Sequence, residues 1–434
     1  MAGKWETGML GDIADLVMGQ SPTGETCNES GIGVPLLNGP TEFGGSHPRP
    51  VQFTTDPRKF ADLGDLLFCV RGSTTGRMNW ADQRYAIGRG LAAIRSKHGK
   101  EYSHFVRAVI DANLPRLLAS ATGSTFPNVS REQIREIECN IPPLAEQKAI
   151  AAILGALDDK IELNRRMNAT LEGMARALFQ SWFVDFDPVR AKLDGRKPEG
   201  MDKATAALFP DAFEESLLGP IPKGWKAGTI EEATSLIIDY RGRTPKKMGS
   251  DWSLTGIPAV SAKNVKGGRL VRPDSFNFVS EELYERWMKD KLALGDILMT
   301  SEAPLGELYY LALSARFCLS QRIFAMRANP AVSEPAYFYY WLDFPACQTD
   351  IINRGTGTTV EGIRQSELRK VPVLLPPLAI QKAAAKFLAA WTEQIHRNEE
   401  QSRTLATLRD TLLPKLLSGE LSVAHSTITK GDKL

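Results

Sequence analysis

The sequence has little of what supports disulfide bonding, zinc binding or membrane insertion. Its five cysteines are scattered and form no C-x-x-C pair, so we predict neither a disulfide framework nor a zinc knuckle, and a reducing cytoplasm is the expected location. The start of the chain lacks the apolar core of a signal peptide. The most apolar stretch near the end, residues 371–380, is interrupted by three prolines. Nothing here indicates a membrane span.

An excess of one charge is also missing. Lysine and arginine total 53 against 51 acidic residues, a net charge of +2, so any nucleic-acid surface must be a local patch. The chain is 43% hydrophobic and 24% charged, as folded proteins usually are. Its 434 residues are too many for one ordinary core, and we expect about two to four domains.

The common catalytic motifs are absent too. The sequence has no G-x-x-x-x-G-K-[ST] phosphate loop, and its five histidines show no H-E-x-x-H pattern. The segment Gly88-Arg-Gly-Leu-Ala-Ala matches G-x-G-x-x-A, but it lies within a strand-like run instead of joining a strand to a helix. We therefore predict no catalytic residues, no metal site and no cofactor bound by this chain.

What the sequence does contain is one pattern repeated twice in the same order. The spacing between matching segments drifts only from 220 to 234 residues, which indicates a duplication with small loop insertions. The clearest matches are Gly33-Val-Pro-Leu-Leu-Asn with Gly256-Ile-Pro-Ala-Val-Ser, Leu63-Gly-Asp with Leu294-Gly-Asp, Thr122-Gly-Ser-Thr with Thr356-Gly-Thr-Thr, and Ile141-Pro-Pro-Leu-Ala-Glu-Gln-Lys with Leu375-Pro-Pro-Leu-Ala-Ile-Gln-Lys.

Each copy predicts a mixed α+β domain that ends in a long helix. Short apolar runs bounded by glycine and proline, such as residues 66–70 and 297–300, indicate strands, and residues 102–118 and 337–352 have helical spacing. After each Pro-Pro comes a proline-free stretch, residues 144–183 and 378–413. The region between the copies, residues 184–224, is rich in Asp, Lys, Pro and Gly and predicts a linker with short helical pieces.

The two long helices carry a heptad-like apolar seam in which Asn164 and Asn398 hold the same position. A buried asparagine costs stability but fixes register, so we predict that these two residues align the helices, although a solvated face would also suit them. At about 1.5 Å per residue each helix would extend beyond the needs of one small core, which favours a spacer.

Several loops combine basic side chains with small hydroxyls, which suit base edges and phosphate oxygens. Any one of them could be a solvated turn, and their presence in both copies favours a binding surface. The candidate DNA-binding residues are Arg71, Ser73, Thr74, Arg77, Arg89, Ser124 and Thr125 in the first copy, and Arg241, Arg243, Lys246, Lys263, Asn264, Lys266, Arg322, Arg354, Thr358 and Thr359 in the second.

The order of these parts resembles the specificity (S) subunits of type I restriction-modification systems, and the resemblance covers nearly the whole chain. Its strongest carriers are the two Pro-Pro-Leu-Ala-x-Gln-Lys segments at 142–148 and 376–382, Leu178-Phe-Gln-Ser-Trp-Phe-Val-Asp-Phe-Asp-Pro-Val, Gly219-Pro-Ile-Pro-Lys-Gly-Trp, and Leu412-Leu-Pro-Lys-Leu-Leu-Ser-Gly-Glu-Leu.

The resemblance implies two target recognition domains, each reading half of a split double-stranded DNA target, separated by two long antiparallel coiled-coil-like helices. It also implies two methyltransferase (M) subunits docked on those helices and two motor-nuclease (R) subunits, with S-adenosylmethionine, ATP and Mg on these partners. The predicted parts are recognition domain 1 (1–143), a central helix (144–183), a linker (184–224), recognition domain 2 (225–376), a C-terminal helix (377–417) and a polar tail (418–434).

Three alternatives stay open from the sequence. The chain could be an enzyme without a known motif, which activity in the absence of partners would reveal. It could be a coiled-coil scaffold, which absence of DNA affinity would reveal. It could also serve a system that modifies DNA without restricting it, which the absence of an R subunit would reveal.

Overall fold

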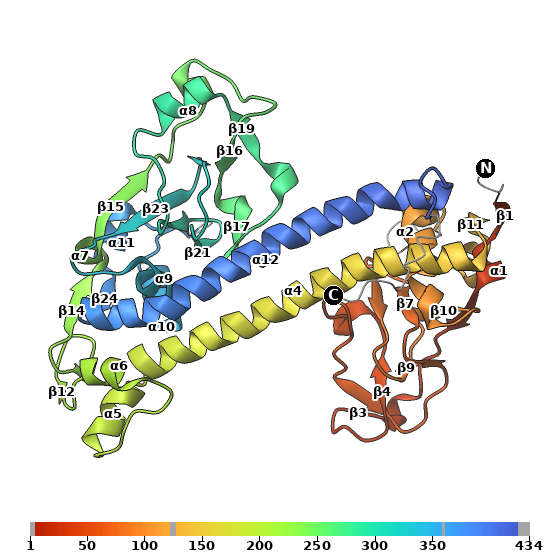
Figure 1. Cartoon of the computed structure of the whole chain (residues 1–434), viewed down its shortest axis with the longest axis horizontal. Coiled ribbons are helices and arrows are strands. Elements are labelled where there is room, and N and C mark those ends of the chain that lie inside the picture. The colour runs from red at the N-terminus through yellow and green to blue at the C-terminus, as the bar shows by residue number, and fades with distance from the viewer. Residues whose placement is uncertain (1–4, 122–126, 358–360, 424–434) are drawn as a thin grey trace, which may run out of the picture. The chain divides into compact units, whose positions relative to one another are not determined.

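In the computed structural model, which describes residues 5–121, 127–357 and 361–423, the chain divides into two compact units (Figure 1). Unit 1 comprises residues 1–166 and 399–434, and unit 2 comprises residues 167–398. Helix α4 (Leu144–Phe183) begins in unit 1 and ends in unit 2, whereas α12 (Leu378–Ser418) begins in unit 2 and ends in unit 1. Each unit therefore contains part of both long helices.

Unit 1 is built on two sheets. A four-stranded sheet has the order β2-β10-β7-β8, and a five-stranded sheet has the order β3-β5-β4-β9-β6, with β4 and β9 parallel. Strands β1 and β11 form a separate antiparallel pair. The bounds of these elements and of α2 are β1 (Glu6–Met9), β2 (Ala14–Met18), β3 (Cys27–Asn28), β4 (Val34–Leu37), β5 (Gln52–Thr54), β6 (Phe60–Ala61), β7 (Leu66–Cys69), β8 (Met78–Trp80), β9 (Tyr85–Ile87), β10 (Leu91–Ser96), α2 (Ser103–Ala119) and β11 (Glu138–Ile141).

Unit 2 repeats the four-stranded sheet and the central three strands of the five-stranded sheet. Its four-stranded sheet has the order β15-β23-β20-β21, its second sheet the order β19-β16-β22 with β16 and β22 parallel, and β14 pairs with β24. The bounds are β14 (Lys226–Thr229), β15 (Thr234–Asp239), β16 (Ile257–Val260), β19 (Asn277–Val279), β20 (Ile297–Ser301), β21 (Leu305–Tyr310), β22 (Cys318–Leu319), β23 (Ile323–Ala328) and β24 (Pro372–Leu375). The predicted α+β fold with an internal duplication is confirmed.

The repeated Leu-Gly-Asp motif has the same structural use in both units. Asp65 is buried and accepts two hydrogen bonds at 2.7 Å from the guanidinium of Arg95 in β10. Asp296 is buried and accepts two at 2.8 Å from Arg327 in β23. Each carboxylate also accepts a hydrogen bond from the backbone three residues earlier, so the motif anchors a turn to the sheet. These hydrogen bonds offset the cost of burying the charged carboxylate.

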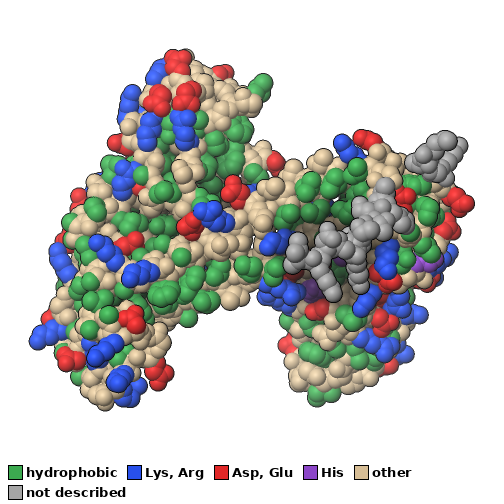
Figure 2. Space-filling model, in the orientation of Figure 1, with side chains coloured by type: hydrophobic (Ala, Val, Ile, Leu, Met, Phe, Trp, Pro, Cys, Tyr) green, Lys and Arg blue, Asp and Glu red, His purple; other side chains and the backbone are tan. Residues whose placement is uncertain are grey.

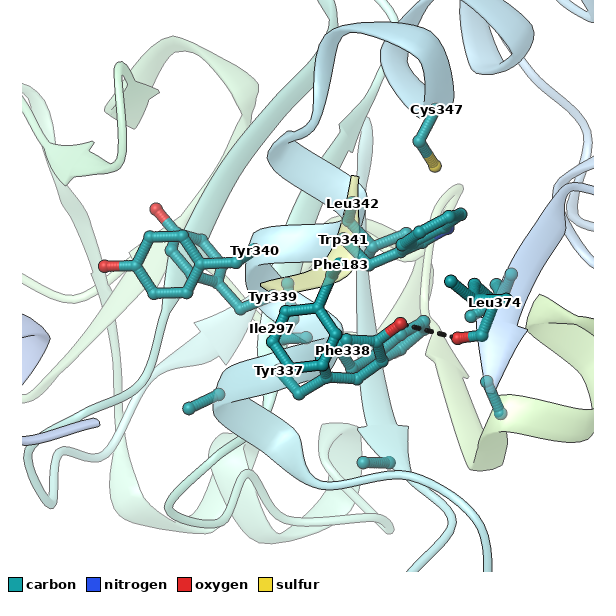
Figure 3. Packing of buried hydrophobic residues seen from close by; sticks show 14 of the residues in the cluster. Phe183, Ile297, Tyr337, Phe338, Tyr339, Tyr340, Trp341, Leu342, Cys347 and Leu374 are labelled. Atoms are coloured by element: carbon teal, nitrogen blue, oxygen red, sulfur yellow. Dashed lines mark hydrogen bonds between the residues drawn. The ribbon is translucent and has the colours of Figure 1, made fainter. Parts of the chain in front are cut away.

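An aromatic core joins the end of α4 to the body of unit 2 (Figure 3). Phe183 of α4 lies edge-on to Tyr337 of α9 (Pro335–Asp343), with ring centroids 4.7 Å apart. The Tyr337 hydroxyl donates a 2.7 Å hydrogen bond to the Leu374 carbonyl in β24 (Figure 3), which satisfies its buried polar atom. The end of the helix is thereby fixed to the domain body.

The long helices pack against each other in both units, and the contacts run in opposite directions along the two helices. In unit 1, Asp158 contacts Arg409 and Asn164 contacts Gln401, which is the antiparallel arrangement. Asn164 is fully buried, and its amide donates to Gln401 Oε1 at 2.9 Å and Ser402 Oγ at 3.2 Å. In unit 2, Asn398 is 4% exposed and donates to Asn168 Oδ1 at 2.8 Å. Both asparagines thus lie buried in the helix pair.

Two details differ from the sequence prediction. Residues 337–352 do not form one helix, because Pro345 cannot continue α9 and instead begins α10 (Pro345–Asn353). The segment between the copies does more than link them, because it contributes buried Val189 and Phe209 to the core of unit 2. Its short helices are α5 (Asp187–Leu193) and α6 (Lys203–Leu208).

Candidate DNA interface

The first group of candidate residues lies in the turn after β7 of unit 1. Arg71, Ser73 and Arg77 are exposed there, whereas Thr74 is half-buried with its hydroxyl 3.7 Å from Cys69 Sγ. The Gly72 N–H donates to the Pro127 carbonyl at 3.1 Å, so this turn is held against the segment that follows residue 126. The turn presents two cations on an ordered backbone.

Arg89 occupies a second position in unit 1, two residues after the end of β9. Its side chain is exposed, and its backbone N–H donates to Ser21 Oγ at 3.2 Å. Within the described part of unit 1, Arg71, Arg77 and Arg89 have no acidic side chain within 4 Å of their guanidinium groups. Their charges are therefore available to an anionic ligand.

Unit 2 has three lysines among its candidates. Lys246, Lys263 and Lys266 are exposed, and none of them forms an ion pair with the residues that the structure describes. Lys263 lines an open pocket of about 450 Å³ together with Arg322 and the indole of Trp252. Basic and acidic side chains alternate over the face seen in Figure 2, in keeping with local cationic sites instead of one basic surface.

Two candidate arginines of unit 2 are committed to internal contacts. Arg241 makes a bidentate pair with Asp239, at 2.9 and 2.8 Å, and its guanidinium lies 3.9 Å from the centre of the Phe324 ring. Arg243 donates to the Trp287 carbonyl at 2.6 Å and stacks on Tyr240. Both side chains are half-buried, and their contacts stabilise the loop, so we rank them below the unpaired cations as candidates for DNA contact.

Two further arginines are paired but reachable. Arg322 is exposed, with its Nε 2.9 Å from Glu302 Oε1. Arg354 is half-buried, with its Nε 2.6 Å from Asp350 Oδ2. A DNA phosphate would have to compete with these carboxylates for the guanidinium groups. Arg322 and Arg354 are therefore better suited to orienting a bound phosphate than to attracting DNA from solution.

One candidate needs correction. Asn264 is fully buried, accepts hydrogen bonds from Ser261 and donates to Ser275 Oγ at 3.0 Å. With no exposed surface and its amide already used, it cannot contact DNA in this conformation and instead closes the loop. Ser124, Thr125, Thr358 and Thr359 lie outside the described residues.

The structure also reveals polar side chains that the sequence patterns did not indicate. Asn38 and Gln52 lie at or next to strand ends in the five-stranded sheet of unit 1. Asn277 and Gln321 lie at or next to strand ends in the three-stranded sheet of unit 2. Asn38, Asn277 and Gln321 are exposed, and Gln52 is half-buried. One signal was present, because Asn38 ends the repeated segment Gly33-Val-Pro-Leu-Leu-Asn, but the common location of these side chains depends on sheet pairing.

Within the described ranges, no cluster of three or more His, Cys, Asp or Glu side chains could hold a metal ion. The helices of that same part of the chain include none with the length and apolarity needed to cross a membrane.

Comparison with known proteins supplies the family. A model of the type I restriction modification DNA specificity domain matches residues 2–173 and 222–405. The chain is 38% identical over 170 residues to a Methanocaldococcus jannaschii protein described as a putative type I restriction enzyme MjaX specificity subunit, covering 39% of this chain and 40% of that one. It is 24% identical over 413 residues to the HindI specificity subunit of Haemophilus influenzae, covering 84% and 88%.

The fold matches the crystal structure of the type I restriction-modification S subunit from M. genitalium with a TM-score of 0.63 and 16% identity, over 95% of this chain and 96% of that one. The family model matches the chain twice, once in each copy of the repeat. Members of this family act in DNA recognition and not in catalysis. The chain belongs to the specificity subunits of type I restriction-modification systems.

Proposed function

We propose that this chain recognises a bipartite double-stranded DNA target, with one half-site bound by each unit. The observation that carries the proposal is the recurrence of one strand order, β2-β10-β7-β8 in unit 1 and β15-β23-β20-β21 in unit 2. Two copies of a fold that differ in their loop side chains suit two different half-sites, since base contacts determine sequence preference.

Recognition is the role of this chain, and the chemistry belongs to its partners. We propose that two M subunits bind S-adenosylmethionine and methylate adenine within the target. Two R subunits with ATP and Mg add translocation and cleavage, and the complex acts in the cytoplasm. Family membership supports this division, as does a sequence without a catalytic or cofactor motif.

The long helices offer two equivalent places for M subunits. Met174 in α4 and Leu408 in α12 are separated by 234 residues, the same offset that relates the two Pro-Pro motifs. Each side chain is 45% exposed, although both belong to helices whose other faces are packed. An apolar side chain left in solvent at the same position of both copies favours a protein partner that binds twice.

Docking is tested with Met174→Asp and Leu408→Asp, each co-expressed with the M subunit and examined by native mass spectrometry. We expect each single variant to retain one M subunit and the double variant to retain none, because a buried unpaired carboxylate opposes association. The control is Ala169→Asp, which places the same carboxylate at an exposed position about 140° away around α4, and it should retain two M subunits. Two M subunits on the double variant would refute these docking positions.

Recognition is tested by sequencing the DNA methylation of cells that express this chain with its M subunit. We expect one methylated motif made of two half-sites with an unspecified gap. Exchange of residues 1–140 for the equivalent part of a relative should change one half-site only. A continuous motif, or a change in both half-sites, would contradict recognition by separate units.

A further inference from the structure

The five-stranded sheet of unit 1 and the three-stranded sheet of unit 2 place polar side chains at equivalent positions. In unit 1, Leu36 of β4 pairs with Ala86 of the parallel strand β9 and with Gln52 of β5. In unit 2, Ala259 of β16 pairs with Cys318 of β22 and with Asn277 of β19. Gln52 and Asn277 therefore occupy the same position in two copies of one sheet.

The same register relates the turns that leave the parallel strands. Arg89 lies two residues after the end of β9, and Gln321 lies two residues after the end of β22. Asn38 follows β4 directly, and Ser261 follows β16. Each unit thus collects its polar side chains at the same ends of its two parallel strands.

In unit 1 these side chains form a packed cluster. The Asn38 amide donates to Gln52 Oε1 at 3.0 Å, which fixes the orientation of both side chains. Gly88 and Gly90 flank Arg89, and a Cβ on either glycine would lie 2.4 Å from an oxygen of Asn38. The backbone of the turn that carries Arg89 therefore packs directly against Asn38, and this close approach leaves no room for a side chain at either glycine.

In unit 2 the equivalent side chains line the 450 Å³ pocket. Asn277 and Gln321 are exposed there, and Trp252 and Lys263 line the same pocket. The next residue, Arg322, has a left-handed backbone with φ of 64° and is paired with Glu302. A non-glycine residue in this conformation is uncommon. The left-handed backbone at Arg322 sets the direction of the turn that carries Gln321.

The chemistry of both clusters suits base edges in the major groove. Asparagine and glutamine amides donate and accept one hydrogen bond each towards adenine, and arginine donates two towards guanine. The four-stranded sheets of the two units are held by the same ion pair, Asp65 with Arg95 in unit 1 and Asp296 with Arg327 in unit 2. At the strand ends the side chains stay polar, but their hydrogen-bonding patterns differ between the copies.

We propose that these strand-end side chains determine base identity in the two half-sites: Asn38, Gln52 and Arg89 in one, and Asn277 and Gln321 in the other. The inference rests on the proposed function and deepens it. Exposed lysines and arginines in neighbouring loops then hold the DNA phosphates, and the strand-end clusters discriminate between bases.

The test compares methylated motifs of variants co-expressed with the M subunit. Arg89→Ala should relax one base pair in one half-site by roughly tenfold. Gln321→Glu should change the preferred base at one position of the other half-site, because a carboxylate accepts from cytosine but cannot donate to a base. The controls are Arg84→Ala and Arg316→Ala, exposed arginines that precede the same strands, β9 and β22, at their opposite ends.

The outcomes separate this inference from the proposed function. A wild-type chain that directs no bipartite methylation would overturn both. A bipartite wild-type motif that persists unchanged in Arg89→Ala and Gln321→Glu would overturn the strand-end assignment alone, as would equal changes in the two controls. If thermal unfolding shows that either variant is unfolded, Gln52→Glu and Asn277→Asp take its place, with the same outcomes required.

Discussion

Asp158 of α4 is the centre of a charge cluster that ties the body of unit 1 to both long helices. Its carboxylate accepts a 2.8 Å hydrogen bond from Arg409 Nη1 of α12. It also lies 3.4 Å from Arg107 Nη1 and 3.7 Å from His104 Nδ1, both of α2. The Asp158 side chain is only 17% exposed, so we expect its removal to destabilise unit 1.

The size of the effect follows from the pKa of Asp158. Burial by itself raises that pKa, but His104 and the charges of Arg107 and Arg409 lower it from 3.8 to about 2. A fall of this size corresponds to roughly 2 kcal/mol of stabilisation at neutral pH. Arg107 keeps Asp111 and Arg409 keeps Asp410 as partners, so Asp158→Asn should not reach the larger cost of stranding a buried charge.

Because the folded-state pKa is depressed, the stabilisation is complete well above pH 4 and is lost as the pH falls towards 2. By pH 3 about half of it should remain. We expect Asp158→Asn to unfold roughly 4–8 °C below the wild type at pH 7, and the gap to narrow at pH 3. Hydrogen exchange should localise the loosened amides to α2 and the adjoining turns of α4 and α12.

Asp159→Asn is the matched control, because Asp159 is the next residue of α4 but is exposed and has no ion-pair partner among the described residues. It should unfold with the wild type at both pH values. Equal unfolding temperatures for the two variants at pH 7 would refute the role of the cluster. So would an Asp158→Asn deficit that stays constant between pH 7 and pH 3.

Three other perturbations have defined outcomes. Arg71→Ala and Lys263→Ala should each weaken binding to all DNA sequences alike and reduce the slope of log affinity against log salt by about one, which salt titrations would measure. Asn164→Leu should leave the chain as stable or stabilise it while permitting other helix registers, which cross-linking between cysteines introduced into α4 and α12 would detect. One heptad added after Asn164 and one before Asn398 should lengthen the paired helices by ~10 Å and the gap in the methylated motif by about three base pairs. An unchanged gap would show that the helices do not set the distance between the half-sites.

The fold was predictable because its signals are local and occur twice. The Pro-Pro motifs mark where α4 and α12 begin, and each motif's glutamine donates to the first proline carbonyl, Gln147 to Pro142 and Gln381 to Pro376. The apolar seam of the two long helices was visible in the sequence as a regular three- and four-residue spacing of apolar residues. The break between α9 and α10 was missed because the helical spacing of apolar residues continues across Pro345, although proline commonly begins a helix.

The candidate site was less predictable because availability depends on distant partners. Arg241 has the same loop chemistry as Arg71, yet its guanidinium also donates to the Ile363 carbonyl, 122 residues away. Asn264 followed a lysine in a loop motif, yet it is fully buried. Of the strand-end residues, only Arg89 was a candidate from the sequence. The other four, Asn38, Gln52, Asn277 and Gln321, were overlooked because their common location appears only when sheet pairing places the parallel strands side by side.

Duplication within one chain explains how a symmetric set of partners could act on an asymmetric target. A homodimer would present identical recognition surfaces, and its two half-sites would be the same. Here positions that serve the scaffold are alike, as with Asp65 and Asp296, and the exposed positions Met174 and Leu408 are both apolar. At the strand ends, by contrast, Arg89 in one copy corresponds to Gln321 in the other. The two copies are thus free to prefer different bases while offering equivalent surfaces to the two M subunits that we propose as partners.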